Sequence, residues 1–297
     1  MTVDARQGHL AMLLFSVFVA GAFSLGAMAA NDILPLAYNA VRFWIAVAII
    51  GVIVALRGGV PRSALQAPWR YFVLAAVFTL YFVLMLEGLK TAPSVSAAAV
   101  FTLTPLMTAG FGWVLLSQGV TNRIAFALTI GALGAFWVIF RADLQAVLRF
   151  DLGRGELIYF VGCISHALYT PLVRVLNRGE SALVFTLGTL VAGAILLTVI
   201  GMPAIMATAW FDLPQIVWIA ILYTAIFASA ATFTLLQFAT LRLLSSKVMA
   251  YTYLIPALVI GWDTALGGTF PPLAIWGGVG LTVVALVLLL RDDGSVA

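Results

Sequence analysis

Charged residues are scarce in this sequence. Asp, Glu, Lys and Arg make up 9% of the 297 residues, whereas 64% are apolar, and soluble domains carry roughly 25% charged residues. A water-soluble fold of this size needs more polar side chains to cover its surface, and a disordered chain has low hydrophobicity and high net charge. The composition therefore predicts an integral membrane protein, in which the aromatic residues, 12% of the chain, include interfacial anchors.

Metal ligands and nucleophiles are also few. The single cysteine, Cys163, excludes an internal disulfide and a cysteine-based metal site, and two histidines cannot form a metal site by themselves. No G-x-x-x-x-G-K-[ST] phosphate loop occurs. The net charge of +4 comes from single basic residues between apolar runs, without the basic patch that nucleic acid requires. We therefore expect no cofactor, no metal, no nucleic-acid partner and no enzymatic activity.

Long apolar runs are what the sequence has in their place. A membrane helix takes roughly 20 mostly apolar residues, and ten such runs occur. They cover approximately residues 10–30, 36–56, 71–90, 94–117, 123–141, 156–175, 182–201, 214–239, 247–267 and 272–290. Strands of an outer-membrane barrel would be ~10 residues long with alternating polarity. The runs therefore predict an all-α integral membrane protein with ten transmembrane helices joined by short loops.

The distribution of basic residues predicts how the chain is oriented. With the N-terminus inside, the inner loops hold Arg6, Arg57, Arg62, Arg70, Arg123, Arg174, Arg178, Arg242, Lys247 and Arg291. The outer loops hold Lys90, Arg141, Arg149 and Arg154. Because Lys and Arg are enriched in cytoplasmic loops, we expect a multi-pass protein of the cell inner (plasma) membrane with both termini in the cytoplasm.

The two halves of the chain resemble each other. Leu103-Thr104-Pro105 in the fourth run matches Leu254-Ile255-Pro256 in the ninth, and glycine pairs follow in the fifth and tenth runs. The shared order of these elements indicates duplication, with repeats at residues 1–150 and 151–297. Each repeat has five runs, and an odd number inverts the second copy. Inverted repeats are typical of transporters with a substrate site near the membrane midplane.

These residues also indicate a family. The stretch from Gly88 to Ala109, with Ala92-Pro93-Ser94 and Leu103-Thr104-Pro105, resembles the signature of the EamA family of the drug/metabolite transporter superfamily. The stretch from Ala239 through Pro256 to Leu290 resembles its second copy. An acidic residue often precedes the next helix in that family, but this chain has Ser117-Gln118-Gly119 and Gly267-Gly268-Thr269 there.

The resemblance implies ten helices in an inverted five-plus-five repeat and export of small metabolites such as amino acids. The YddG-type amino-acid exporters are among the members that it suggests. The partners are then a small-molecule substrate and the lipid bilayer. Transport of a nucleoside, a sugar or a drug-like solute is the alternative, and a polytopic enzyme or a channel is a more distant one.

Residues near the middle of the runs are the candidates for binding substrate. Polar and aromatic side chains at that depth would face a cavity, because lipid offers them no hydrogen-bond partner. The candidates are His166, Tyr81, Thr79, Phe82, Tyr169, Tyr223, Tyr253 and Thr104. His166 stands out, since an imidazole can bind a carboxylate when protonated or take part in proton coupling. The alternative is a neutral histidine bonded to another helix, and for the tyrosines it is ordinary helix packing.

A second group of residues is expected to control access. Arg42, Glu87 and Asp263 lie at similar depths toward the outer side, and we predict that Arg42 pairs with one of the acids and helps to close the outward exit. The alternative is that Arg42 snorkels to the interface and Glu87 pairs with Lys90. Pro105 and Pro256 remove backbone donors in mid-helix and are candidate hinges. Small residues in the fifth and tenth runs predict close helix contact, either as scaffold or as the face of a homodimer.

Overall fold

The computed structural model describes residues 3–149 and 152–290. Within these ranges the secondary structure is helical and without strands, and ten helices are long and apolar enough to cross a membrane. The prediction of an all-α, ten-span membrane protein is confirmed. The expected boundary between the repeats, after residue 150, and Arg291 lie outside the described residues.

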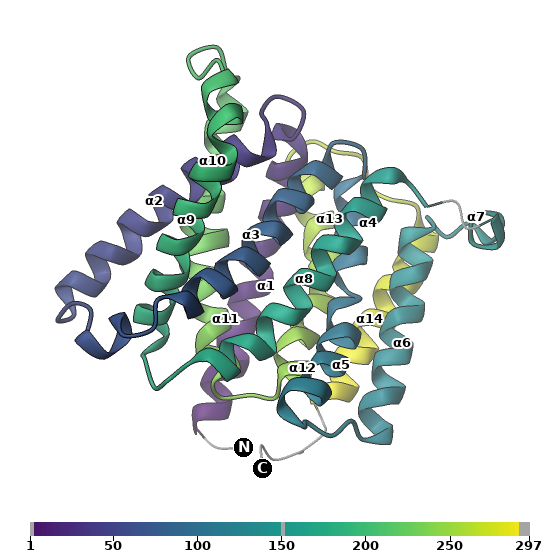
Figure 1. Ribbon diagram of the computed structural model, residues 1–297. Coiled ribbons are helices and arrows are strands. Elements are labelled where there is room, and N and C mark those ends of the chain that lie inside the picture. The colour runs from purple at the N-terminus through teal and green to yellow at the C-terminus, as the bar shows by residue number, and fades with distance from the viewer. Residues whose placement is uncertain (1–2, 150–151, 291–297) are drawn as a thin grey trace.

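Five of the ten spans belong to each half of the chain, and Figure 1 shows their arrangement. The first half contains α1 (Val3–Ala29), α2 (Pro35–Leu56), α3 (Trp69–Leu89), α4 (Ser94–Phe101) continued by α5 (Thr104–Leu116), and α6 (Asn122–Ile139). The second contains α8 (Arg154–Leu176), α9 (Ala182–Ala207), α10 (Gln215–Ala225) continued by η2 (Ile226–Ala231) and α11 (Thr232–Thr240), α12 (Ser245–Ala250) continued by η3 (Tyr251–Leu254) and α13 (Ile255–Ala265), and α14 (Leu273–Leu290). The short helices η1 (Arg62–Leu65) and α7 (Leu144–Arg149) lie in connections.

The fourth and ninth spans are interrupted at matching places. Pro105 and Pro256 each stand at the first positions of a new helix, α5 and α13, where a missing N–H leaves no hydrogen bond unmade. In the fourth span, Thr102 and Thr104 donate hydroxyl hydrogen bonds of 2.6 Å to the carbonyls of Ala99 and Phe101. These two bonds satisfy carbonyl groups at the break in the fourth span. In both repeats the proline stands at the start of the second half-helix of its span.

The two repeats run in opposite directions. In Figure 1, α1 starts at the bottom and rises, whereas α8, the first span of the second repeat, starts at the upper right near α7 and descends. We call the side where α1 begins and α14 ends the terminal face, and the opposite side the distal face. The inverted five-plus-five arrangement expected from the odd number of spans is therefore present.

The main helix contacts join the two repeats. α2 packs on α9, α6 on α14, and α3 on α8, and the counterpart of the last pair, α1 against α10 and α11, is present as well. Glycines allow the closest approaches: a Cβ atom added at Gly134 of α6 would lie 2.6 Å from the carbonyl oxygen of Gly278 in α14. Small residues thus pack α6 on α14 within one chain, and the homodimer stays a prediction.

Candidate substrate-binding site

The centre of the bundle is a cluster of aromatic side chains from both repeats. We define this central aromatic cluster as Phe78, Tyr81 and Phe82 of α3, Phe101 of α4, Tyr159, His166 and Tyr169 of α8, and Phe233 of α11. Phe78 lies at its middle: its ring is stacked on that of Tyr169, with the centroids 4.0 Å apart, and is tilted against that of Phe233, with the centroids 4.2 Å apart. Phe78 and His166 stand near the middle of α3 and α8, and inverted-repeat transporters hold their substrates near the membrane midplane.

His166 lies inside this cluster. Its ring is 1% exposed, with the Tyr81 ring centroid at 4.5 Å and the Phe101 centroid at 5.0 Å, both edge-on. Its Nδ1 atom has no hydrogen-bond partner among the described residues. A buried polar atom without a partner is costly, so His166 is a group that a bound ligand can satisfy.

Hydroxyl and amide groups fix the other members of the cluster. The hydroxyls of Tyr81 and Tyr159 are 3.1 Å apart, which joins α3 to α8. Gln237 donates from Nε2 to the Tyr169 hydroxyl at 2.9 Å and accepts at Oε1 from Thr186 at 3.0 Å. A chain of hydrogen bonds thus connects α8, α11 and α9 behind the aromatic rings and keeps Tyr169 stacked on Phe78.

Two small voids adjoin the cluster, each of about 10 Å³. One is lined by Phe78, Tyr81 and His166, the other by Arg42 and Asn39, and both are lined by Phe82. Each is roughly the size that holds one water molecule. The centre is therefore closed in this structure, and a solute can enter only when helices or side chains move.

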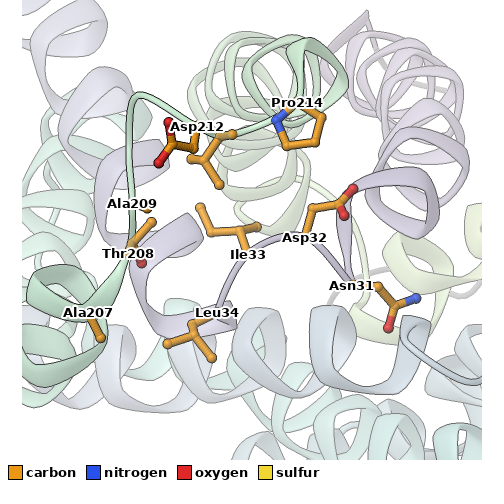
Figure 2. A pocket seen from close by; sticks show the side chains of 10 residues that line it. Asn31, Asp32, Ile33, Leu34, Ala207, Thr208, Ala209, Asp212 and Pro214 are labelled. Carbon is orange, nitrogen blue, oxygen red and sulfur yellow. The ribbon is translucent and has the colours of Figure 1, made fainter.

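A hollow opens on each face of the bundle. The terminal face has a groove of about 830 Å³, which we call the terminal vestibule; α1, α2, the start of α9, η2 and α11 line it, with Arg57 and Arg242 at its rim. The distal face has a hollow of about 530 Å³ between the α1–α2 and α9–α10 loops. Asp32 and Asp212 line this distal hollow, one from each loop (Figure 2). The closed centre thus lies between two wide openings.

A buried ion pair lies at the terminal end of α3. Arg70 donates to Glu180 at 2.6 Å, and the side chains are 1% and 4% exposed. Arg70 also donates to the carbonyl oxygens of Leu176 at 2.6 Å and Ala67 at 3.2 Å. Burial opposes ionisation of Glu180, but hydrogen bonds from Arg70 and the Arg178 amide outweigh it and lower the pKa of this carboxyl group. The pair ties α3 of the first repeat to the α8–α9 loop of the second.

The predicted substrate residues do not all meet at the centre. His166, Tyr81 and Phe82 line the central voids, and Tyr169 stacks behind them. Four others point elsewhere, as their contacts show: Thr79 packs by Gly193 of α9, Thr104 bonds Phe101, Tyr223 bonds the carbonyl oxygen of Phe18, and Tyr253 lies against Gly131 of α6. Their substrate role stays a prediction, and depth along a helix does not tell which face a residue occupies.

The predicted ion pair of Arg42 is absent, and that part of the prediction is wrong. Glu87 instead bonds Lys90 at 2.6 Å, and Asp263 accepts a hydrogen bond from Ser94. Arg42 turns into the bundle rather than toward either acid, because the second repeat offers it a carbonyl and a hydroxyl there. The gating roles of Arg42, Glu87, Asp263, Pro105 and Pro256 stay predictions.

Sequence reasoning missed part of this site. Tyr38 and Asn39 lie four and three residues before Arg42 and thus flank the same face of α2, and all three residues line one central void. Polar residues at helical spacing in an apolar run are the signal that could have found them. Phe78, by contrast, is one of 20 phenylalanines, and nothing in its neighbourhood in the sequence distinguishes it.

The sequence pattern of the EamA-like transporter family matches this chain twice, at residues 6–140 and 153–291. The chain belongs to the EamA-like transporter family. It is thus a multi-pass membrane protein whose partners are the lipid bilayer and a small-molecule substrate. Family membership points to a transporter rather than an enzyme, and the two matches agree with the five-plus-five architecture.

A curated relative agrees with this assignment, and a solved structure shares the fold. The chain is 26% identical over 283 residues to "Uncharacterized transporter YyaM" of Bacillus subtilis (strain 168), covering 95% of this chain and 92% of the relative. A crystal structure described as "Crystal structure of protein" matches with a TM-score of 0.69 at 20% identity, over 96% of this chain and 95% of the other. At that identity the second match shows the fold alone.

Proposed function

We propose that this EamA-family protein is a secondary transporter that exports small organic metabolites, with aromatic and other apolar amino acids as its substrates. The observation that carries the proposal is the closed aromatic cluster between two inverted repeats, with a hollow on each face. Inverted repeats can rock about a fixed midplane site and open it to one side at a time. Export then follows from alternating access to the central aromatic cluster.

The chemistry of the centre favours a solute with an apolar body. Phe78, Tyr81 and Phe82 offer ring faces and edges, and aromatic pairs contribute about 0.5–1.5 kcal/mol beyond the area that they bury. The buried Nδ1 of His166 adds one polar atom that lacks a partner. An inorganic cation finds no carboxylate among the residues that line the two central voids.

The proposal also covers where the helices bend during transport and which face of the bundle lies in the cytoplasm. The helix interruptions before Pro105 and Pro256 are the places where the fourth and ninth spans bend as the repeats rock. The excess of basic residues on the terminal face, as in Arg57, Arg70 and Arg178, supports a cytoplasmic position for that face in the inner (plasma) membrane. The terminal vestibule is then the cytoplasmic entrance, and the distal hollow is the exit.

Counterflow in liposomes tests the proposed function. Purified protein is reconstituted into vesicles loaded with unlabelled phenylalanine, and uptake of labelled phenylalanine is measured with and without a pH gradient. Protein-free vesicles are the control, and leucine, a nucleoside and a sugar are run in parallel. Phenylalanine and leucine are expected to exchange. Exchange of the nucleoside or the sugar alone would contradict the amino-acid assignment and leave the transporter class standing.

A histidine variant tests the place of the site. His166→Ala is expected to lower phenylalanine counterflow by at least about tenfold, the scale of one charged or well-placed hydrogen bond. His9→Ala is the matched control, because His9 contacts the Tyr251 hydroxyl at 3.0 Å and lies outside the central aromatic cluster. Wild-type rates and an unchanged pH dependence for His166→Ala would remove His166 from the substrate site.

A further inference from the structure

Arg42 is a buried cation without an acid. Its side chain lies in α2 and is 3% exposed, yet no carboxylate within the described ranges forms an ion pair with it. Its partners are neutral: Nε donates to the Ser229 hydroxyl at 2.7 Å, and one terminal nitrogen donates to the Ala228 carbonyl at 2.6 Å. The other terminal nitrogen has only the Asn39 amide oxygen, at 3.4 Å.

The guanidinium group of Arg42 therefore has N–H donors that remain free to bind a ligand. Arginine has five N–H donors in a planar fork, and Arg42 uses three of them, one over a long distance. The Phe82 ring lies 3.9 Å from its central carbon and offsets part of the charge. A charge taken out of water remains costly when no opposite charge pairs with it, and ionisable groups inside membrane proteins commonly mark the path of a substrate.

The surroundings of Arg42 continue into the proposed substrate site. The void beside Arg42 and the void beside His166 share Ala22, Phe82 and Met85 as walls. One end of this divided space thus has a guanidinium group with Asn39, and the other end has aromatic rings. Rotation of the Phe82 or Met85 side chain would join the two voids into one elongated site, charged at one end and apolar at the other.

The charge balance selects one kind of anion. Arg42 is the only charged residue lining these two voids in the described part of the chain, so a monoanion neutralises it. A doubly charged phosphate would leave one negative charge unpaired in a medium of low dielectric constant. The ammonium group of an amino acid finds no acid there and remains an unpaired positive charge, so a carboxylate without that group should bind at least as tightly. A carboxylate matches the fork of the guanidinium in charge and in geometry.

We infer that Arg42 binds the carboxylate of the transported solute, and that the site selects small monocarboxylates with an aromatic or apolar body. This inference rests on the proposed function and makes it narrower: the carboxylate is required, and the amino group is not. Arg42 is held by η2, a π-helical turn of the second repeat; such turns frequently occur at functional sites. An anion bound there contacts the seam between the repeats, where it can affect their relative movement.

Ligand-induced stabilisation of the purified full-length protein in detergent tests the inference at pH 7.5. Four probes share one ring: phenylalanine, 3-phenylpropionate, phenylalanine amide and phenyl phosphate. Phenylalanine and 3-phenylpropionate are expected to raise the Tm in a saturable way, and the amide, which lacks the carboxylate, is not. Equal protection by the amide, stronger protection by the phosphate, or no protection by either carboxylate would overturn the inference.

Variants of Arg42 test whether binding of the carboxylate probes depends on this residue. Arg42→Gln is expected to weaken 3-phenylpropionate binding by about 10- to 100-fold, the range for a hydrogen bond to a charged group, whereas Arg42→Lys retains part of the affinity. Arg123→Gln is the control, because it removes an exposed arginine at the start of α6 that lines neither central void, and it should leave the affinity unchanged. Unchanged affinity in Arg42→Gln would refute the assignment. If that variant does not fold, the four probes on the wild-type protein still decide.

The inference and the proposed function fail in different ways. Phenylalanine counterflow in liposomes, together with equal binding of the acid and the amide, would leave a transporter whose Arg42 is structural. Binding of the two carboxylates that depends on Arg42, without counterflow of any of the amino acids, would leave an anion site and refute amino-acid export.

Discussion

The buried ion pair between Arg70 and Glu180 gives the clearest prediction about stability. Glu180→Gln keeps the shape of the side chain and removes its charge, which leaves the guanidinium of Arg70 buried without a counter-charge. Breaking a buried pair costs about 3–5 kcal/mol, and we expect the low end, because Arg70 keeps its bonds to the carbonyls of Leu176 and Ala67. At about 2–4 °C per kcal/mol for a large domain, the apparent Tm should fall by roughly 6–12 °C.

The control is the other ion pair among the described residues. Glu87 and Lys90 are 2.6 Å apart, but their side chains are 39% and 25% exposed, and exposed pairs contribute about 0–1 kcal/mol. Glu87→Gln should therefore change the Tm by no more than about 4 °C. Both variants are measured by thermal unfolding in the same detergent at pH 7. A loss for Glu180→Gln no larger than that for Glu87→Gln would refute the burial argument.

The same pair predicts a dependence on pH. The pKa of Glu180 is lowered in the folded protein, so the folded state favours the ionised carboxylate. Its contribution is complete above the unfolded pKa of about 4.3 and is lost as the pH falls through the lower folded value. The Tm difference between wild type and Glu180→Gln should be constant from pH 8 to pH 5 and shrink below about pH 4.3. A difference that grows on acidification would show that the sign is wrong.

Three further predictions concern packing and orientation. Gly134→Ala should lower the Tm, because the added Cβ atom would lie 2.6 Å from a carbonyl oxygen of α14. Gly280→Ala is the control and should leave the Tm unchanged, because its Cβ atom would have nothing within 4 Å. Equal effects of the two variants would contradict the close helix contact. Phe78→Ala should cost about 3–5 kcal/mol in stability, since its ring is 2% exposed at the middle of the central aromatic cluster, and a smaller loss in chemical unfolding would show that the centre is loosely packed. Ala209→Cys should react with a membrane-impermeant thiol reagent added outside intact cells, while Cys163, which is fully buried, leaves the parent protein unlabelled; labelling only after lysis would place the distal face in the cytoplasm.

The fold could be predicted from the sequence because lipid imposes simple demands on it. Each span must satisfy its own backbone hydrogen bonds, so ten apolar runs become ten helices, and the odd number in each repeat inverts the second. The structure departs from the predicted ends where sequence carries little signal. The seventh span continues through Pro203 to Ala207, since proline is tolerated in membrane helices when the surroundings satisfy the freed carbonyl.

The substrate site was harder to predict than the fold. Position along a run gives depth in the membrane, and this depth predicts His166 and Tyr81, which line a central void. Rotation about the helix axis is set by packing between distant segments, and Tyr253 consequently lies against Gly131 rather than in a central void. The π-helical turn at Ile226–Ala231 contains no proline or glycine from which the sequence could predict a break in the helix. Two hydrogen-bond partners of Arg42, Ala228 and Ser229, come from this turn, 186 and 187 residues away in the chain.

The seams between the repeats have a consequence for biosynthesis. α2, α3 and α6 find their main partners in α9, α8 and α14, so the first five helices reach the bilayer before the helices that cover them have been made. Until then, the face of α6 that carries Gly134 and the face of α2 that carries Arg42 lack their partners from the second repeat and are exposed to lipid. A ribosome stalled near residue 150 would thus leave a five-helix fragment with uncovered helix faces. Such a fragment would be prone to bind chaperones, to be degraded by proteases, or to pair with a second fragment inserted in the opposite orientation.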